Sequence, residues 1–522
     1  MNLKFTSEKK NNFFALIAGA FVVLAFAPFH FFVAAIISLS VFYFLLEKAT
    51  KKKEIFWLGF FFGFGHFLCG IYWIAISLLV DASQFAWLIP FALTLIPSAL
   101  ALYLALFALS YKFFVTKFNF EKTYQKILIF ALCWLFFEIL RSVLFTGFPW
   151  NLLGYVWMFS EGQMQLASVF GIFGLTVFAV LISLFPTLFL NAKGRKKKSE
   201  IFFGDKIFAA ILILFLVVNV VFGLFHIDEK SLINDHKTTL RLVQANIKQE
   251  MKWDQKEKYQ NFLKHIELTN SKNLDEVDAV IWSETSVPYV IDDSPELLHK
   301  LSLAVPAQGN LITGGLRLEY GDSAKTEISN AWNSAFVLSK NKVTQTYDKH
   351  HLVPFGEYVP LQKFLPFIDK ITGGGVGFSK GEGAKTLLMD DFSFSPLICY
   401  EAIFTQEVID KNNRPDLFIN LTNDAWFGSS SGPYQHFDMT KMRAVEYGIS
   451  LVRVAGTGIS AFIDPFGRVV AKIGLNEEGI VDVDLIKNSN STIYRDYGFL
   501  PLLILIGLML LSLVISAKKR IF

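Results

Sequence analysis

Residues 395–404 read SPLICYEAIF, a short apolar run that ends in Cys399 and is followed at once by a tyrosine and a glutamate. A run of this kind between polar segments is typical of a buried strand. Similar runs recur through residues 226–495, such as LRLVQANI, DAVIWSET, LFINLTND and GIVDVDL, and helical segments such as KEKYQNFLKHIELTNS and PYQHFDMTKMRAVEYG separate them. We therefore predict one α/β domain of about 270 residues, which is enough for a substantial core.

The segments on either side of this domain are strongly apolar. Of the 522 residues, 53% are hydrophobic and only 18% are charged, against about 25% charged in soluble domains. A transmembrane helix needs about 20 mostly apolar residues. The candidates are roughly 12–28, 30–46, 55–80, 86–111, 126–145, 165–190, 206–225 and 498–517. We expect a membrane protein with about eight spans, seven before the α/β domain and one after it.

The positions of the lysines predict the orientation of these spans. A lysine-rich segment precedes the first span. EKATKKKE follows the second span, KFFVTKFNFEKTYQK the fourth, KGRKKK the sixth and AKKR the eighth. The loops DASQ and TGFPWNLLGYVWMFSEGQ, between these clusters, contain no lysine or arginine. Basic loops stay in the cytoplasm. Both termini are therefore expected in the cytoplasm and the α/β domain outside it, with the bilayer and no nucleic acid as a partner.

Cys399 is the only cysteine of the predicted α/β domain, since Cys69 and Cys133 lie in the apolar segments. A lone thiol in an oxidising compartment is a liability, so its presence suggests a use. A nucleophilic thiol needs a base to take its proton and a donor for the oxyanion that its attack creates. Glu284 and Lys349 follow other predicted strands, and strand ends that meet at one sheet edge can assemble such a site.

Seven motifs in order carry a resemblance to a known family: LVQANIKQEMKWD, WSETSVPY, YDKHHLVPFGEYVP, ICYEAIF, LTNDAWFG, GPYQHFDMTKMRAVE and GISAFIDPFG. They resemble the nitrilase superfamily and, within it, the membrane-embedded apolipoprotein N-acyltransferase family. The resemblance covers nearly the whole chain. It implies a transmembrane helical domain over 1–225, a periplasmic nitrilase-like αββα sandwich over 226–495, and a C-terminal helix with a basic cytoplasmic tail over 496–522, in the inner membrane. The stretch RVAGTGISA departs from the family pattern, which commonly has an asparagine there; this affects pocket detail only.

The resemblance also implies roles for residues at matching positions. Glu284 is expected to be the general base, Lys349 the stabiliser of the oxyanion and Cys399 the nucleophile. A second active-site glutamate and three residues for substrate handling and support of the site are expected at Glu357, Trp253, Tyr400 and Glu401. The implied reaction moves an acyl chain from a phospholipid, plausibly phosphatidylethanolamine, through a Cys399 thioester to the α-amine of the S-diacylglyceryl-cysteine of an apolipoprotein. No metal or other cofactor is implied.

Two other functions are compatible with the same residues. A membrane-anchored nitrilase-type amidase would use the same three groups with water as the acceptor. A transporter or binding protein could carry a degenerate nitrilase fold, although the intact Glu-Lys-Cys set argues against it.

Several local expectations accompany this interpretation. A helix is expected to begin near Thr405, next to the thiol. His350, His351 and His436 are expected to be structural and not metal ligands, and Glu138 and Arg141 to form an ion pair near the outer interface. For the stretch PLQKFLPFIDKI, ordinary packing and a mobile hydrophobic flap are weighted equally, and the sequence does not decide whether residues 361–385 move.

Overall fold

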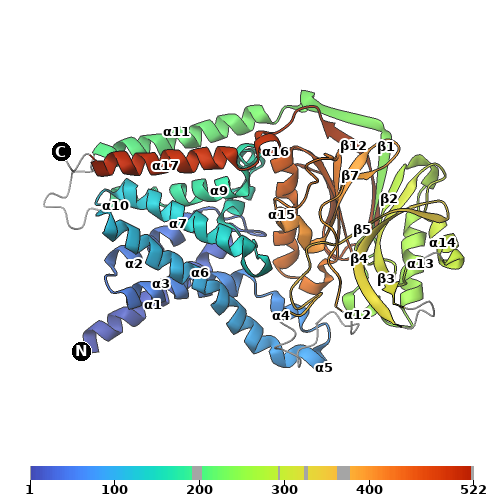
Figure 1. The fold of residues 1–522 in the computed structure, drawn as a ribbon, viewed down its shortest axis with the longest axis horizontal. Helices are drawn as coiled ribbons and strands as arrows, with labels where there is room; N and C mark the ends of the chain where they lie inside the picture. Colours follow the sequence, from blue (N-terminus) through green and yellow to red (C-terminus); the bar gives the residue numbers. More distant parts are fainter. Residues whose placement is uncertain (1, 191–202, 292–293, 322–326, 361–376, 519–522) are drawn as a thin grey trace. The chain divides into compact units, whose positions relative to one another are not determined.

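The computed structural model describes residues 2–190, 203–291, 294–321, 327–360 and 377–518. The chain forms two compact units (Figure 1). The helical unit comprises Met1–Ala75, Trp87–Ile227 and Thr492–Phe522. The sheet unit comprises Asp228–Ser491 and also the short segment Ile76–Ala86.

The helical unit is built from long apolar helices. Its main helices are α1 (Asn2–Val22), α2 (Val33–Lys48), α3 (Lys52–Gly70), α6 (Ile89–Lys117), α7 (Thr123–Val143), α9 (Ala167–Ser183), α11 (Phe203–His226) and α17 (Leu500–Lys518). Within the described residues, four helical stretches are long and apolar enough to cross a membrane: Ala82–Lys117, Thr123–Thr146, Ala167–Leu190 and Phe203–His226. Leu500–Ser516 is a shorter apolar helix.

The predicted span over 55–80 is longer than the helix that forms there. Helix α3 ends at Gly70, and Ile71 leaves helical geometry with φ −131° and ψ 23°. Glycine is a poor helix former because it loses the most backbone entropy on ordering. A separate four-residue helix, α4 (Ile74–Ser77), follows.

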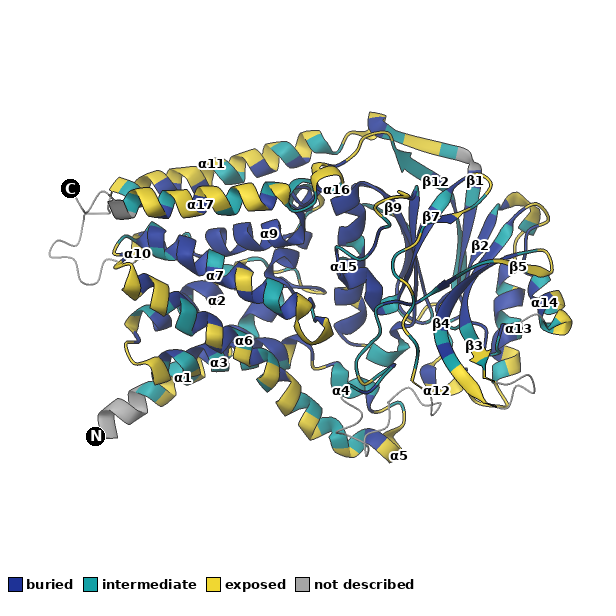
Figure 2. Cartoon of the chain, viewed as in Figure 1, coloured by how far each residue is buried: buried dark blue, intermediate teal, exposed yellow. Residues whose placement is uncertain are grey.

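Burial differs sharply between helices of this unit (Figure 2). Helix α9 is buried along nearly its whole length. Helix α11, in contrast, exposes apolar side chains such as Leu214, Val217 and Leu224. An apolar helix that leaves such side chains uncovered is suited to a lipid surrounding.

Glu138 and Arg141 of α7 are both buried, and their contacts bind neighbouring segments. Glu138 accepts hydrogen bonds from Trp134 Nε1 at 2.9 Å, from the Leu153 amide at 2.8 Å and from Thr176 Oγ1 at 2.8 Å. Arg141 donates to main-chain carbonyls of the loop that follows α7. Glu138 and Arg141 therefore hold the loop after α7, and the Arg141 charge also acts on the Glu138 carboxyl group.

The sheet unit contains two sheets. Its strands are β1 (Leu232–Gln244), β2 (Ala279–Ile281), β3 (Asn310–Tyr320), β4 (Ile328–Ser339), β5 (Lys342–Asp348), β6 (Leu387–Leu388), β7 (Ser393–Ile398), β8 (Leu417–Thr422), β9 (Ser450–Ala455), β10 (Ser460–Ile463), β11 (Val469–Ile473) and β12 (Gly479–Asn488). Among the described residues, one six-stranded sheet has the order β12-β1-β2-β3-β4-β5 and the other β11-β10-β9-β8-β7-β6. The central strands of each are parallel: β1 to β3 in the first sheet and β7 to β9 in the second.

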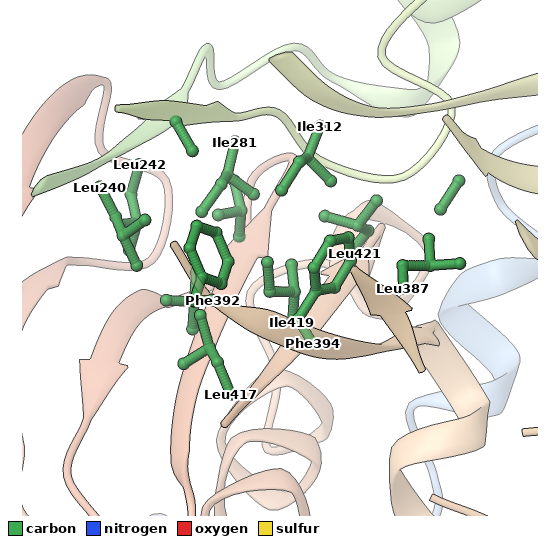
Figure 3. Packing of buried hydrophobic residues seen from close by; sticks show 14 of the residues in the cluster. Leu240, Leu242, Ile281, Ile312, Leu387, Phe392, Phe394, Leu417, Ile419 and Leu421 are labelled. Atoms are coloured by element: carbon green, nitrogen blue, oxygen red, sulfur yellow. The ribbon is translucent and has the colours of Figure 1, made fainter. Parts of the chain in front are cut away.

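The two sheets face each other across an apolar core (Figure 3). Leu242 and Ile281 of the first sheet belong to the same cluster as Phe394 and Ile419 of the second. A second cluster joins the outer face of the first sheet to α13 (Lys258–Thr269) and α14 (Pro295–Ser302). Helix α15 (Gly432–Tyr447) packs on β9. The resulting layers are those of an αββα sandwich.

The parallel strands are largely apolar because both of their faces are covered, although β8 and β9 also bury polar residues such as Asn420 and Arg453. Every residue of β8 and β9 is buried, as expected for strands between a second sheet and a helix. Helix α15 has a proline in its first turn and ends at Gly448, whose φ of +62° is left-handed. Proline is favoured at a helix start and glycine just past its end.

Candidate active site

The carboxyl ends of the parallel strands carry two of the predicted site residues. Glu284 lies three residues beyond β2, and Cys399 follows β7 directly. Lys349 follows β5 directly, in the same sheet as Glu284. Glu357 lies in the loop beyond Lys349, where the Glu357 amide donates to Val353 O at 2.9 Å.

Lys349, Glu284 and Glu357 form one buried cluster. Lys349 Nζ lies 2.9 Å from Glu357 Oε1 and 4.0 Å from Glu284 Oε1. Asn333 of β4 connects the two glutamates, since its Nδ2 donates to Glu284 Oε1 at 2.7 Å and to Glu357 Oε1 at 3.0 Å. Asn333 was not among the predicted site residues. Its only signal was its place as the polar first residue of the predicted strand NSAFVLS.

Cys399 occupies a strained position. Its φ is +52°, a left-handed conformation that is unfavourable for a residue with a side chain. It is the first residue of a short 3-10 helix, Cys399–Ile403. The expectation of a helix beginning near Thr405 is wrong, because the chain beyond Ile403 forms turns. Such strain at the end of a buried strand is typical of a functional side chain that must project from a sheet edge.

The electrostatic surroundings keep the thiol protonated at rest. Burial, reinforced by the Glu284 carboxylate, raises the pKa of Cys399 to about 12, although Lys349 acts in the opposite direction. Burial also raises the pKa of Glu284, again against the effect of Lys349. A carboxylate whose pKa is raised is a stronger base. Glu284 is therefore suited to take the thiol proton during attack on a carbonyl.

Lys349 remains an ammonium in this site. Its burial disfavours the charge, but the carboxylates of Glu357 and Glu284 outweigh burial and raise its pKa. A fixed buried ammonium that interacts with Cys399 can stabilise negative charge that develops on a substrate oxygen.

Glu401 connects the cysteine segment to the lysine segment. Its Oε2 accepts from the Ile398 amide at 2.7 Å, directly before Cys399. Its Oε1 accepts from the His350 amide at 2.7 Å and from Tyr347 OH at 2.9 Å. His350 Nδ1 also lies 2.8 Å from Oε1. Burial acts against these interactions, but together they hold the pKa of Glu401 below its usual value.

The two histidines that follow Lys349 are bound to carboxylates. His351 Nδ1 lies 2.6 Å from Glu407 Oε2, and the His351 ring stacks on Phe404 with 3.6 Å between centroids. Tyr400 packs edge to face on Phe404 at 5.0 Å. The aromatic ring of Tyr400 thus supports the loop after Cys399.

A buried cluster of His436, Arg453 and Asp424 lies behind Cys399. His436 Nε2 is 3.2 Å from the carbonyl oxygen of Cys399, and since a carbonyl only accepts, Nε2 is the donor. Nδ1 of the same ring lies between the Arg453 guanidinium at 3.1 Å and the Asp424 carboxylate at 2.9 Å. Arg453 also donates to Asp424 at 2.7 Å. His436, expected to be structural, therefore contacts the backbone of the predicted nucleophile.

Trp253 lies outside this buried cluster. It follows the short helix α12 (Gln249–Lys252), and 40% of its surface is exposed. Its neighbour Lys252 is buried instead and donates from Nζ to the main-chain oxygen of Glu284 at 2.9 Å. Lys252 was not among the predicted site residues.

The segment over 361–385 is only partly described. Residues 361–376 lie outside the described residues, so neither ordinary packing nor a mobile flap is tested for them. Three residues just beyond them are bound to the site by main-chain hydrogen bonds: Phe378 to Glu357, Ser379 to Ala331 and Gly381 to Lys349. Residues 378–381 thus run along the lysine and glutamate segments.

Comparison with known proteins places the whole chain. The family model "Apolipoprotein N-acyltransferase N-terminal domain" matches residues 18–185, and "Carbon-nitrogen hydrolase" matches residues 239–492. The apolipoprotein N-acyltransferase of Rickettsia prowazekii is 39% identical over 520 residues, which cover 97% of this chain and 99% of the relative. The apolipoprotein N-acyltransferase of Brucella melitensis is 35% identical over 528 residues, with 97% and 96% covered. The chain therefore belongs to the apolipoprotein N-acyltransferase family, within the nitrilase superfamily.

Proposed function

We propose that this protein transfers a fatty acyl chain from a membrane phospholipid to the N-terminal S-diacylglyceryl-cysteine of apolipoproteins. The observation that carries the proposal is the buried cluster of Glu284, Lys349 and Glu357 together with Cys399 at a left-handed strand end. It supplies a base, a fixed cation and a nucleophile in a chain that belongs to this family.

In the first half-reaction, Cys399 Sγ attacks the carbonyl carbon of an acyl ester in the phospholipid, here the sn-1 ester of phosphatidylethanolamine. Glu284 takes the thiol proton. Lys349 Nζ and the Tyr400 amide donate to the oxyanion of the tetrahedral intermediate. The carbon–oxygen bond to glycerol then breaks, and Glu284 returns the proton to the leaving alkoxide. A lysophospholipid departs and Cys399 holds the acyl chain as a thioester.

In the second half-reaction, the free α-amine of the diacylglyceryl-cysteine attacks the thioester carbonyl. Glu284 takes a proton from the attacking nitrogen, and the same oxyanion donors act again. The carbon–sulfur bond breaks, and the thiolate recovers the proton from Glu284. The products are an amide-linked third acyl chain and the free enzyme, so the route is ping-pong and returns all three groups to their starting state.

We propose that membrane embedding serves both substrates, since donor and acceptor are lipids with long acyl chains. The arrangement of lysines favours about eight spans, with both termini in the cytoplasm. The α/β domain over 226–495 would then face the periplasm, the domains over 1–225 and 496–522 would anchor it in the inner membrane, and Trp253 at the exposed end of α12 would contact substrate.

Intact-protein mass spectrometry tests the proposal. The purified full chain is incubated with phosphatidylethanolamine and no acceptor peptide. The expected result is a mass increase of one fatty acyl group that hydroxylamine removes and that Cys399→Ala abolishes, while Cys69→Ala, at another cysteine, retains it. Released fatty acid without an adduct would favour a hydrolase with water as acceptor. If neither an adduct nor released fatty acid were found, the proposal would be overturned.

A further inference from the structure

Lys252 is a buried lysine whose ammonium contacts the backbone of the predicted base. Only 8% of its surface is exposed. Its Nζ donates to the main-chain oxygen of Glu284 at 2.9 Å. Burying an ammonium is costly unless nearby charges or hydrogen bonds compensate. The surroundings of Lys252 must therefore contain the compensation.

Helix α12 is held so that Lys252 cannot easily swing into solvent. Gln249, at its start, accepts from Asn423 Nδ2 at 2.7 Å. The Met251 carbonyl accepts from Asn261 Nδ2 of α13 at 2.8 Å. These contacts connect α12 to the end of β8 and to α13. The buried position of Lys252 is thus built by three separate elements.

The charges near Lys252 show what its ammonium offsets. Glu284 and Cys399 both interact electrostatically with it. His265 of α13 is the third titratable group near it; burial lowers the pKa of His265 to about 4, so this ring is neutral. Lys349 faces two carboxylates, Glu284 and Glu357. The single ammonium of Lys349 balances only one of these two carboxylates. The ammonium of Lys252 balances the other.

We infer that Lys252 is a positioning residue of this active site. Its buried ammonium holds the Glu284 segment by a main-chain oxygen and balances the second carboxylate of the cluster. It thereby keeps Glu284 ionised and able to accept the Cys399 proton. The inference rests on the proposed function, in which Glu284 is the base.

The titration behaviour agrees with this role. The Lys252 charge lowers the pKa of Glu284, in opposition to burial. Burial lowers the pKa of Lys252 itself to about 8, so its ammonium persists at neutral pH and is lost in mild alkali. An opposite charge at short range lowers a carboxyl pKa by about 1 to 3 units. Removal of Lys252 should therefore raise the pKa of Glu284.

The test is the pH dependence of acyl-adduct formation on Cys399, measured by intact mass with phosphatidylethanolamine from pH 4.5 to 9. The variants are Lys252→Met, Lys252→Gln and Lys252→Arg. Lys248→Met serves as the matched control because Lys248 is exposed and directly precedes α12. The expected result is that Lys252→Met and Lys252→Gln raise the acidic midpoint by about one unit, so that the rate below that midpoint falls by about tenfold. Lys252→Arg and the control Lys248→Met should retain the wild-type midpoint.

Lys252→Gln keeps an amide donor and guards against a failure of the Met variant to fold. An unmoved acidic midpoint in folded Lys252→Gln, even with a uniform loss of rate at every pH, would overturn the inference and leave Lys252 with a purely structural role. A wild-type protein that forms no adduct would instead overturn the proposed function, so the two failures are distinguishable.

Discussion

Replacing Glu401 by glutamine should uncouple the Cys399 segment from the Lys349 segment. The carboxylate of Glu401 is fully buried and accepts from the Ile398 amide on one oxygen and from the His350 amide and Tyr347 on the other. Glutamine turns one of these oxygens into a donor. At least one buried donor then faces another donor, which costs about 1 to 3 kcal/mol.

The charge of Glu401 adds a contribution that depends on pH. Despite its burial, hydrogen bonds to Glu401 and Glu407 raise the pKa of His350 to about 9, against about 6.5 in an unfolded chain. The difference corresponds to about 3 kcal/mol of stability. Because the folded pKa is raised, this stability is fully present below about pH 6.5 and is lost as the pH rises through about 9. Glu401→Gln should remove most of it.

Thermal unfolding of the full chain in detergent, followed by tryptophan fluorescence from pH 5.5 to 9.5, measures both effects. Below pH 6.5 the two contributions add to about 3 to 6 kcal/mol, so the variant should unfold about 6 to 24 °C below the wild type at about 2 to 4 °C per kcal/mol. The gap should narrow by about 5 to 10 °C toward pH 9.5 as wild-type His350 loses its proton. Glu296→Gln is the control, since its side chain is 80% exposed. A gap between Glu401→Gln and wild type that stays constant with pH would refute the reasoning about His350.

Three further variants test the geometry around the base and the nucleophile. Gly314→Ala places a Cβ 2.7 Å from Glu284 Cα, so displacement of Glu284 should lower the rate of adduct formation by about 100-fold. The control Gly479→Ala, whose Cβ would have no atom within 4 Å, should behave as wild type. Equal rates for the two variants would contradict the close packing at Gly314. Asn333→Asp adds a third carboxylate to the cluster of Glu284 and Glu357. Because a like charge disfavours ionisation, the acidic midpoint of the adduct rate should rise by at least about one unit. An unmoved midpoint would argue against Glu284 as the base. His436→Phe removes the donor to Cys399 O and should slow the adduct by about tenfold, with partial recovery in His436→Gln; equal rates for both would leave His436 with a packing role only.

Much of the fold follows from local patterns in the sequence. The largely apolar runs at 395–398, 417–422 and 450–455 form buried strands because most of their residues are apolar on both faces, which a sequence displays directly. The membrane character follows from the long apolar stretches for the same reason. In contrast, β5 reads KVTQTYD, and the sequence marks it only weakly as a strand because it is an edge strand with mostly polar residues.

The candidate site divides in a similar way. Cys399 could be singled out because its type is rare and its position ends an apolar run. The 3-10 turn in place of a helix near Thr405 depends on the Glu401 carboxylate, which bonds the Ile398 amide and the lysine segment together.

The contacts of Asn333, Lys252 and His436 became visible only in the tertiary structure. Each joins a site residue that is 32 to 49 positions away in the chain. The sequence by itself determined the two kinds of domain, the strands of the central sheets and the residue types capable of the chemistry. The partners that set the charge and orientation of those residues were decided by the packing of the two sheets, because hydrogen bonds and charge interactions depend on distance in space and not on separation along the chain.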